Sequence, residues 1–197
     1  MRRLRTLLIL TAALPVAACT AMNGEDGMAR SPASTAQAAV MVGGAAMYPT
    51  RNIVENAVNS ADHITLVAAV KAAGLVDTLM GAGPFTVFAP TNAAFDRLPA
   101  GTVAMLVKPE NQPTLQKILT YHVVSGRLTA GDLMQRIRTG GGSARLTTVQ
   151  GGTLVARMQG GNVVLVDQKG GVSTVTQADV MQSNGVIHVT NRVSMPA

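Results

Sequence analysis

The sequence predicts an α+β fold in a single domain, with helices mainly in the first half of that domain and antiparallel strands in the second. The chain has 197 residues, little more than one average domain, and 47% of them are hydrophobic, which is enough for a core. Apolar residues recur at helical spacing between 52 and 137, whereas short apolar stretches separated by glycine-containing loops fill 145–193. Helical segments followed by a run of hairpins are typical of α+β domains.

Helices are predicted wherever apolar residues repeat three or four positions apart. Ser60 or Asp62 can cap the second helix, because a short side-chain oxygen accepts hydrogen bonds from the free N–H groups of a first turn. Gly74 is predicted to end the same helix, since glycine readily adopts the left-handed conformation. The predicted helices are 52–59, 64–71, 75–80, a short one containing Phe95 and Leu98, 103–107, 113–120 and 128–137.

One short strand is predicted among the helices. Residues 85–89 read Phe-Thr-Val-Phe-Ala, and Phe88 lies on the face opposite the other three apolar side chains, because side chains alternate along a strand. A strand that is apolar on both faces is expected at the centre of a sheet. Thr91 or Asn92 then turns the chain and is predicted to cap the next helix.

The second half is predicted to be an antiparallel meander. Loops containing Gly-Gly connect its first four stretches, and loops of this length are typical hairpin connectors. Asn184 and Gly185 precede the last strand, where they are expected to supply a positive φ. His188 falls within that last strand. The predicted strands are 145–149, 153–158, 162–167, 172–179 and 186–193, with 121–124 also extended.

The N-terminus reads as a targeting segment. Three arginines among the first five residues precede an uncharged apolar run, 6–18, which is shorter than the roughly 20 residues of a membrane-spanning helix. These features predict a signal peptide over 1–18. Small residues before Cys19 resemble a bacterial lipobox, in which the cysteine is acylated and becomes the mature N-terminus. The alternative is an ordinary signal peptide with Cys19 as a bystander.

A lipid on Cys19 would anchor the protein to the cell envelope through its acyl chains. Thr20 in place of an aspartate favours the outer membrane, by analogy with Gram-negative sorting. Residues 19–48 are rich in Ala, Gly, Ser and Met, so we interpret them as a flexible tether that spans on the order of 30 Å. A short helix over 36–42 is the alternative. The domain itself is assigned to 49–197.

Composition excludes several classes of function. The net charge is +6, and removal of the three N-terminal arginines leaves 13 basic against 10 acidic residues, or +3. No basic run remains and only 3% of residues are aromatic, so nucleic-acid binding is not expected. The single cysteine excludes an intramolecular disulfide.

Three segments together resemble the fasciclin-like domain family. They are GPFTVFAPTNAAF at 83–95, ILTYHVVSGRL at 118–128 and ADVMQSNGVIHVTNRVSMP at 178–196, in the order and spacing of the family. The resemblance covers roughly 48–196. It implies a wedge of β-strands packed with several helices, in a bacterial fasciclin-domain lipoprotein.

The resemblance also implies interaction residues. Tyr121 and His122 match a tyrosine–histidine pair implicated in cell adhesion in animal members. Asp179 and Val180 match an Asp-Ile pair implicated in integrin recognition, with Val in place of Ile. The alternatives are a Tyr121 packed in the core with its hydroxyl bonded internally, and an Asp179 that serves a turn or a cap.

A structural role is implied for the histidine matched by His122. In the family this residue is thought to brace the segment that corresponds to Thr91 and Asn92 here. That role concerns the integrity of the fold and involves no chemistry.

Metal binding and catalysis are not expected. His63, His122 and His188 are the three histidines, and Asp96 or Asp179 would have to complete a site. Their spacing fits no metal motif, no paired carboxylates accompany them, and no Gly-x-Ser-x-Gly occurs. We therefore expect no metal, no cofactor and no enzymatic activity.

The sequence thus predicts a membrane-anchored, extracytoplasmic binding and cell-adhesion module that acts through surface contacts. Its expected partner is an envelope or matrix protein or polysaccharide. The alternative is a carrier or sensor of a small apolar ligand, held in a groove between helices and sheet. Methionines such as Met80, Met105, Met134 and Met158 can line such a pocket, although methionine at helical spacing more often belongs to a core.

Overall fold

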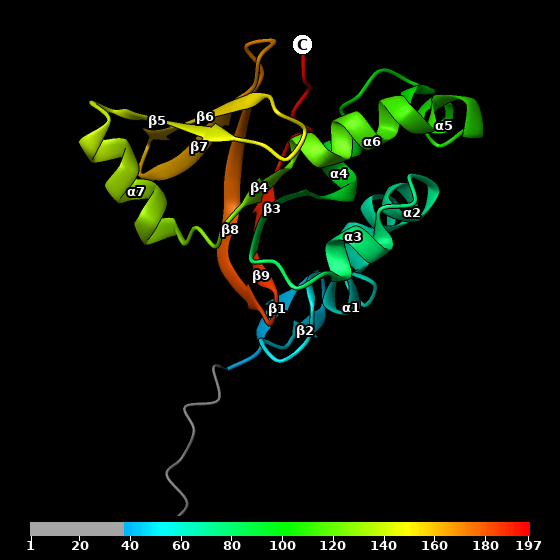
Figure 1. The fold of residues 1–197 in the computed structure, drawn as a ribbon, viewed down its shortest axis with the longest axis horizontal. Coiled ribbons are helices and arrows are strands. Elements are labelled where there is room, and N and C mark those ends of the chain that lie inside the picture. Colours follow the sequence, from blue (N-terminus) through cyan, green and yellow to red (C-terminus); the bar gives the residue numbers. More distant parts are fainter. Residues whose placement is uncertain (1–37) are drawn as a thin grey trace, which may run out of the picture. The chain divides into compact units, whose positions relative to one another are not determined.

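A mixed sheet of seven strands organises the domain (Figure 1). The computed structural model describes residues 38–197, and the strands of this sheet follow the order β4-β3-β9-β8-β7-β6-β5. All neighbours are antiparallel except β3 and β9. The strands are β3 Phe85–Pro90, β4 Val123–Ser125, β5 Ser143–Thr147, β6 Thr153–Gln159, β7 Asn162–Val166, β8 Val172–Gln182 and β9 Gly185–Thr190.

The α+β prediction is confirmed, and so is the antiparallel meander, which runs from β5 to β9. The central position predicted for β3 is also confirmed, because β3 lies between β4 and β9. Its parallel pairing with β9, from Phe85 opposite Gly185 to Pro90 opposite Thr190, joins segments about a hundred residues apart. No local pattern in the sequence predicts this parallel pairing.

The sheet curls until its two outer strands touch. Val124, in β4, forms a bridge with Thr148, just beyond the end of β5. The backbone N–H of Val149 donates to the carbonyl of Val123 at 2.7 Å. The pairing of β8 with β9 also shifts register twice between Val175 and Val180, and such bulges bend a strand. The curved sheet therefore buries side chains on both of its faces.

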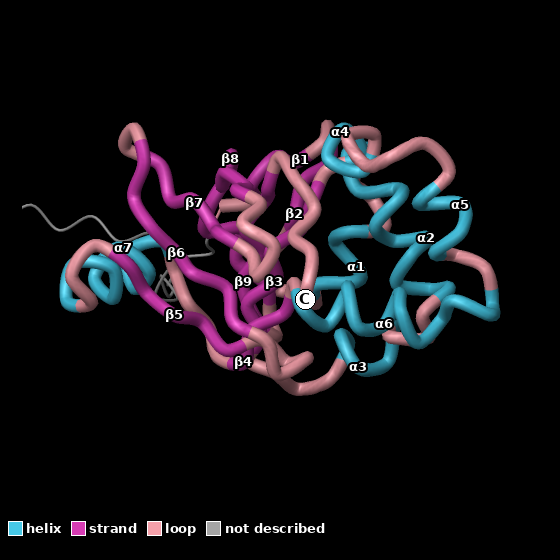
Figure 2. Tube along the Cα trace, turned by 90° about the horizontal axis from the view of Figure 1, so that it is seen from above, coloured by secondary structure: helices cyan, strands magenta, loops and turns pink. Residues whose placement is uncertain are grey.

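The sheet divides the interior into two hydrophobic cores. Val87 and Ala89 of β3 pack into the core on the side of helices α1 to α6, whereas Phe88 packs into the core under α7. Figure 2 shows this division, with α1 to α6 on one side of the strands and α7 on the other. The alternation expected for β3 thus explains how one strand supplies both cores.

The helices form where the apolar periodicity predicts them, with small shifts at their ends. Gly74, at φ 68°, ends α2 as expected, and the N–H of Leu75 donates to the carbonyl of Val70 at 3.1 Å. Helix α7 begins with a capping box that Thr129 and Asp132 form. The helices are α1 Ile53–Ala57, α2 Ile64–Ala72, α3 Val76–Met80, α4 Asn92–Phe95, α5 Thr102–Leu106, α6 Gln112–Tyr121 and α7 Ala130–Thr139.

The end of the predicted tether is part of the folded domain. Residues 40–47 form a hairpin of β1 Val40–Val42 and β2 Ala45–Met47, not a tether or a short helix. Val42 is 3% exposed and Met47 is 1% exposed, because both pack into the core on the side of α1. The compact unit therefore begins near Gln37 and not at residue 49. The predicted signal peptide 1–18 and Cys19 lie outside the described residues.

The expected positive φ before the last strand is wrong. Neither Asn184 nor Gly185 has a positive φ. Glycine is required at 185 for a different reason, which is the close approach of the parallel strand. A Cβ on Gly185 would lie 2.1 Å from the carbonyl oxygen of Phe85.

Candidate functional site

His188 lies at the centre of an internal polar framework. Its Nε2 donates to the carbonyl of Leu128 at 2.8 Å, and its Nδ1 accepts from the backbone N–H of Asp179 at 3.3 Å. The ring is fully buried and stacks on Phe88 with the centroids 5.5 Å apart. Burial lowers the pKa of His188, so the ring is neutral and carries its proton on Nε2.

Asp179, at the bulge of β8, makes a second hydrogen bond between the sheet and the start of α7. It is the one non-glycine residue with a positive φ among residues 38–197, at 58°. Its Oδ1 accepts from the backbone N–H of Ala130, the first residue of α7, at 2.7 Å. Thr86 makes a third tie, since its hydroxyl accepts from the N–H of Leu128 at 2.9 Å. Three side chains thus fasten the segment before α7 to the sheet.

Tyr121 and His122 are internal residues at the end of α6. The hydroxyl of Tyr121 donates to the carbonyl of Thr153 at 2.7 Å, and the side chain is fully buried. His122 is 3% exposed; its Nδ1 donates to the carbonyl of Ile118 at 2.8 Å, and its Nε2 accepts from the N–H of Ser194 at 2.9 Å. Burial lowers the pKa of His122, which keeps the ring neutral.

The brace expected between His122 and the segment of Thr91 and Asn92 is not made by the ring. The hydrogen bonds of the His122 ring instead fix Ile118 and the C-terminal segment at Ser194. The expected cap at Thr91 or Asn92 is also absent, since neither side chain caps α4. The Asn92 side chain reaches α2, where it accepts from the N–H of Thr65 at 3.0 Å. Asn92 therefore caps the start of α2, not its own helix.

Asn184 performs a similar long-range task. Its side-chain oxygen accepts from the N–H of Ile53 at 3.1 Å, at the start of α1. Its side-chain nitrogen donates to the carbonyls of Leu79 and Gly81, at 2.8 and 2.9 Å, where α3 ends. Sequence reasoning assigned this residue only a turn. The turn motif gives no signal of the two helices that its side chain joins.

Burial limits which of the family-implied residues can meet a partner. Tyr121 and Val180 are fully buried and His122 is nearly so. Direct contact through these three side chains is therefore incompatible with the folded domain, and the alternative of an internally bonded Tyr121 agrees with the geometry. Asp179 lies at a bulge inside β8 and not in a turn, and its bond to the first residue of α7 fits the capping alternative. Asp179 is half-buried, and its part in binding stays a prediction. These residues are also not one site, because Tyr121 and Asp179 belong to separate hydrogen-bond sets.

The third histidine, His63, lies apart from the other two. Its Nδ1 is 2.9 Å from the hydroxyl of Ser60, while its Nε2 is buried without a hydrogen-bond partner. That nitrogen belongs to a side chain that borders a cavity of about 20 Å³ among apolar neighbours, and burial lowers the pKa of His63. Residues 38–197 hold no group of three or more His, Cys, Asp or Glu that could bind a metal ion.

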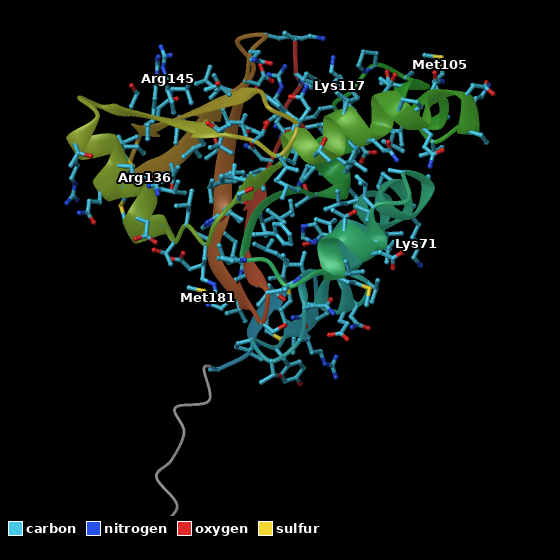
Figure 3. The ribbon with its side chains drawn as sticks, viewed as in Figure 1. Lys71, Met105, Lys117, Arg136, Arg145 and Met181 are labelled. Atoms are coloured by element: carbon cyan, nitrogen blue, oxygen red, sulfur yellow. The ribbon has the colours of Figure 1, made fainter. Side chains whose placement is uncertain are left out.

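An apolar groove opens between α1, α2, α3, α6 and β3. Its volume is about 60 Å³ and its lining is almost wholly apolar. The helices that border it lie together on one side of the sheet (Figure 3), with Lys71 on α2 at the rim. Representative lining residues are Val54, Val67, Leu75, Val76, Leu119 and Val149.

The groove agrees in position with the one predicted between helices and sheet, but not in its lining. None of the four methionines expected there borders it. Met80, Met105 and Met158 are exposed, and Met134 packs against the core under α7. Figure 3 shows Met105 on α5, at the outer edge of the helices. Branched aliphatic side chains line the groove instead, and the same residues follow the helical periodicity that predicted a core.

Comparisons with known proteins define the class. The Fasciclin domain model matches residues 61–196, which is more than half of the chain. This chain belongs to the Fasciclin domain family. Its fold is similar to that of the FAS1 domain pair from the insect cell adhesion molecule fasciclin I, with a TM-score of 0.67, 19% identity, and coverage of 75% of this chain and 52% of that one.

Two relatives show the range of similarity. "Protein sll1483" of Synechocystis sp. is 42% identical over 174 residues, which cover 88% of this chain and 89% of the relative. "Cell surface glycolipoprotein MPB83" of Mycobacterium bovis is 58% identical over 53 residues, 27% of this chain and 23% of the relative. Family members are thus found among cell-surface and cell-adhesion proteins. Within residues 38–197, no helix is long and apolar enough to cross a membrane.

Proposed function

We propose that this chain is a membrane-anchored, extracytoplasmic binding and adhesion module that acts through surface contacts, without catalysis. The proposal rests on the observation that the buried polar side chains are bonded to the backbone of the domain itself. Backbone groups of distant segments form hydrogen bonds with the side chains of His122, His188 and Tyr121. Groups held in this way stabilise the fold and are not free to transfer a proton to a ligand.

The anchor is inferred from Cys19 and its position after an apolar run. One relative is named a cell-surface glycolipoprotein, and this name supports a lipid anchor here. The residue after Cys19 bears on which membrane holds the chain, and both the periplasmic and the surface face fit this assignment. We place it at the outer membrane because of Thr20.

The apolar groove is the part of the described surface best suited to hold an apolar group of a partner protein. Its volume of about 60 Å³ is well below the ~150 Å³ of an apolar cavity that binds benzene. It therefore fits the tip of one aliphatic side chain or one acyl chain better than a whole ligand. Tight interfaces are commonly anchored by such a side chain in a dry pocket.

A substitution at the groove tests this proposal. Val67→Lys places a charge in the lining, whereas Ile64→Lys changes the same helix at a side chain that is 63% exposed and does not line the groove. The acylated protein is incubated with envelope proteins and matrix polysaccharide, and retained material is quantified. We expect the Val67 variant alone to lose binding. No retained partner at micromolar concentration for the parent protein would contradict the proposal.

A second function, the carriage of a small apolar ligand, is favoured by the same groove. It requires α1 or α3 to move, because the observed volume is too small for a ligand of ordinary size. Native mass spectrometry separates the two functions. A co-purified lipid supports the carrier, and a bare protein mass supports adhesion. An elemental assay for zinc on the same sample tests the non-catalytic proposal, because a metal-dependent hydrolase would carry the metal stoichiometrically.

A further inference from the structure

A second hollow, of about 240 Å³, lies where three distant segments meet. Arg97 follows α4, Lys169 lies in the loop between β7 and β8, and Arg192 follows β9. All three side chains are exposed and line the same hollow. The fold thus gathers three positive charges that are at least 23 positions apart in the sequence, which no run of basic residues predicts.

The floor of this hollow is held rigidly. Oδ1 of Asp167 accepts from the N–H groups of Lys169 and Gly171, at 3.0 and 2.7 Å. Its Oδ2 accepts from the N–H of Met195 at 2.9 Å. One carboxylate therefore fixes the loop that carries Lys169 and the C-terminal segment that follows Arg192. Asp167 brings one negative charge against the three positive charges of the hollow, so the hollow keeps a net positive charge.

The three cations have no acidic partner of their own. Within residues 38–197 the ion pair that forms is between Lys108 and Glu110, at 3.9 Å, on another part of the surface. Asp96, beside Arg97 in the sequence, borders a separate neighbouring hollow. A concave surface on which three exposed cations outnumber one carboxylate attracts ligands of negative charge.

The hollow lies at one end of the domain. It includes the C-terminal segment and the β7–β8 loop, which lie at the end of the domain away from the β1–β2 hairpin where the described chain begins (Figure 1).

We infer that the hollow formed by Arg97, Lys169 and Arg192 binds an acidic polysaccharide through the carboxylate or sulfate of one sugar unit. Arginine forks match such groups in a bidentate way. The volume is below that of a pocket for a drug-sized ligand, which suits a single unit of a chain. No aromatic side chain lines the hollow, so the stacking on which single-stranded nucleic acid depends is missing. This inference rests on the proposed function and adds to it a second contact surface, separate from the apolar groove.

The test measures binding of the full-length acylated protein in detergent to a soluble polyuronate, with neutral dextran as the negative probe. We expect the polyuronate to bind and the affinity to fall as salt is raised, because the charges are exposed. The double variant Arg97→Gln/Arg192→Gln should weaken binding about tenfold or more, the loss expected when a charge-assisted hydrogen bond is removed.

A matched control removes the same amount of charge elsewhere. Arg145→Gln/Arg157→Gln alters two exposed arginines on β5 and β6 that do not line the hollow. Figure 3 shows Arg145 pointing away from α7 on the outer side of the sheet. We expect this variant to bind within about twofold of the parent. An equal loss in both double variants would mean nonspecific attraction and would overturn the inference.

Two further outcomes are decisive. Vesicles containing anionic phospholipid serve as a second probe, and a parent protein that binds them while ignoring the polyuronate overturns the inference in favour of a lipid surface. In the pull-down of envelope material, retention of acidic polysaccharide by the hollow variant equal to that of the parent also overturns it but leaves the proposed function standing. Retention of nothing by the parent contradicts the proposed function itself.

Discussion

His188 connects the last strand to Leu128, at the start of the segment that leads into α7, through a hydrogen bond of 2.8 Å. The same ring accepts from the N–H of Asp179, whose carboxylate holds the first residue of α7. Two strands and one helix are therefore aligned by a single neutral imidazole. One ring nitrogen donates to a carbonyl and the other accepts from an N–H, so the neutral ring bridges two backbone groups. This bridging gives the buried histidine a structural role that needs no catalysis.

Removal of the His188 ring should destabilise the domain. His188→Ala leaves the carbonyl of Leu128 and the N–H of Asp179 without partners and opens a cavity beside Phe88, so we expect a loss of about 3 kcal/mol in the free energy of unfolding. Urea unfolding followed by circular dichroism measures it. Thr147→Ala, at an exposed side chain of β5, is the control and should cost less than about 0.5 kcal/mol. Equal midpoints for the two variants would refute the role of His188.

Asp179 allows its structural and binding roles to be separated. Asp179→Ala loses the bond to Ala130 and places a less tolerant residue at φ 58°, which should cost about 1–2 kcal/mol. Asp179→Asn keeps both an acceptor and a residue that tolerates this conformation, so its stability should stay within about 0.5 kcal/mol of the parent. If the Asn variant is stable but no longer retains a partner, the carboxylate acts in binding. Unchanged retention assigns Asp179 to the fold alone.

Gly185 and Gly131 should respond to alanine in opposite directions. A Cβ at Gly185 would overlap the carbonyl of Phe85, and we expect Gly185→Ala to cost about 3 kcal/mol or more, because two paired strands must separate. Gly131 lies in α7, where the nearest atom to an added Cβ is 3.6 Å away. Gly131→Ala should therefore stabilise the protein by about 0.5–1 kcal/mol. Thermal unfolding of both variants is the measurement, and a shift of the same sign in both would contradict the prediction.

Stability should fall as the pH is lowered below neutrality. Burial lowers the folded-state pKa of His63, His122 and His188 from 6.5, so the unfolded chain binds more protons below that pH. The contribution of these residues is complete above about pH 6.5 and is lost as the pH falls from there toward the lowered folded-state values. Urea midpoints between pH 7.5 and 5.5 measure this loss before most carboxylates titrate. A midpoint that rises as the pH falls would be inconsistent with three neutral buried rings.

The predicted lipid depends on a single thiol. Cys19→Ala should abolish acylation and shift the protein from the membrane fraction to the soluble fraction of fractionated cells, while the mass of the mature parent should exceed that of its residues by the acyl groups. Ser31→Ala, in the tether, serves as a control that should leave the distribution unchanged. An unmodified parent cleaved elsewhere would indicate an ordinary signal peptide.

Much of the fold was predictable because its causes are local. Glycine pairs between short alternating stretches place the hairpins of β5 to β8, and Gly74 ends α2 through its own left-handed backbone. The two apolar faces of residues 85–89 also predicted a central strand. Periodicity and turn chemistry act over a few residues, so one sequence is enough to read them.

The candidate sites were less predictable because they depend on segments that meet only in the folded chain. Nothing near Asn184 shows that it joins α1 to α3, and Arg97, Lys169 and Arg192 share a hollow only because the C-terminal segment returns past α4. The hairpin at 40–47 was not predicted because half of its residues are alanine or glycine and only Val42 and Met47 are fully buried, with Val40 packed against the core. A pattern of two buried residues is too short to distinguish from a tether.

The sequence by itself determined the fold class, the family and the order of most elements. Hydrophobic periodicity, turn residues and the three motifs are each local, so they can be recognised without the tertiary structure. The tertiary structure alone decided that β3 pairs in parallel with β9, that Tyr121 and His122 are enclosed, and that an apolar groove and a basic hollow are left open. The physical reason is that exposure depends on every segment packed around a side chain, including those a hundred residues away.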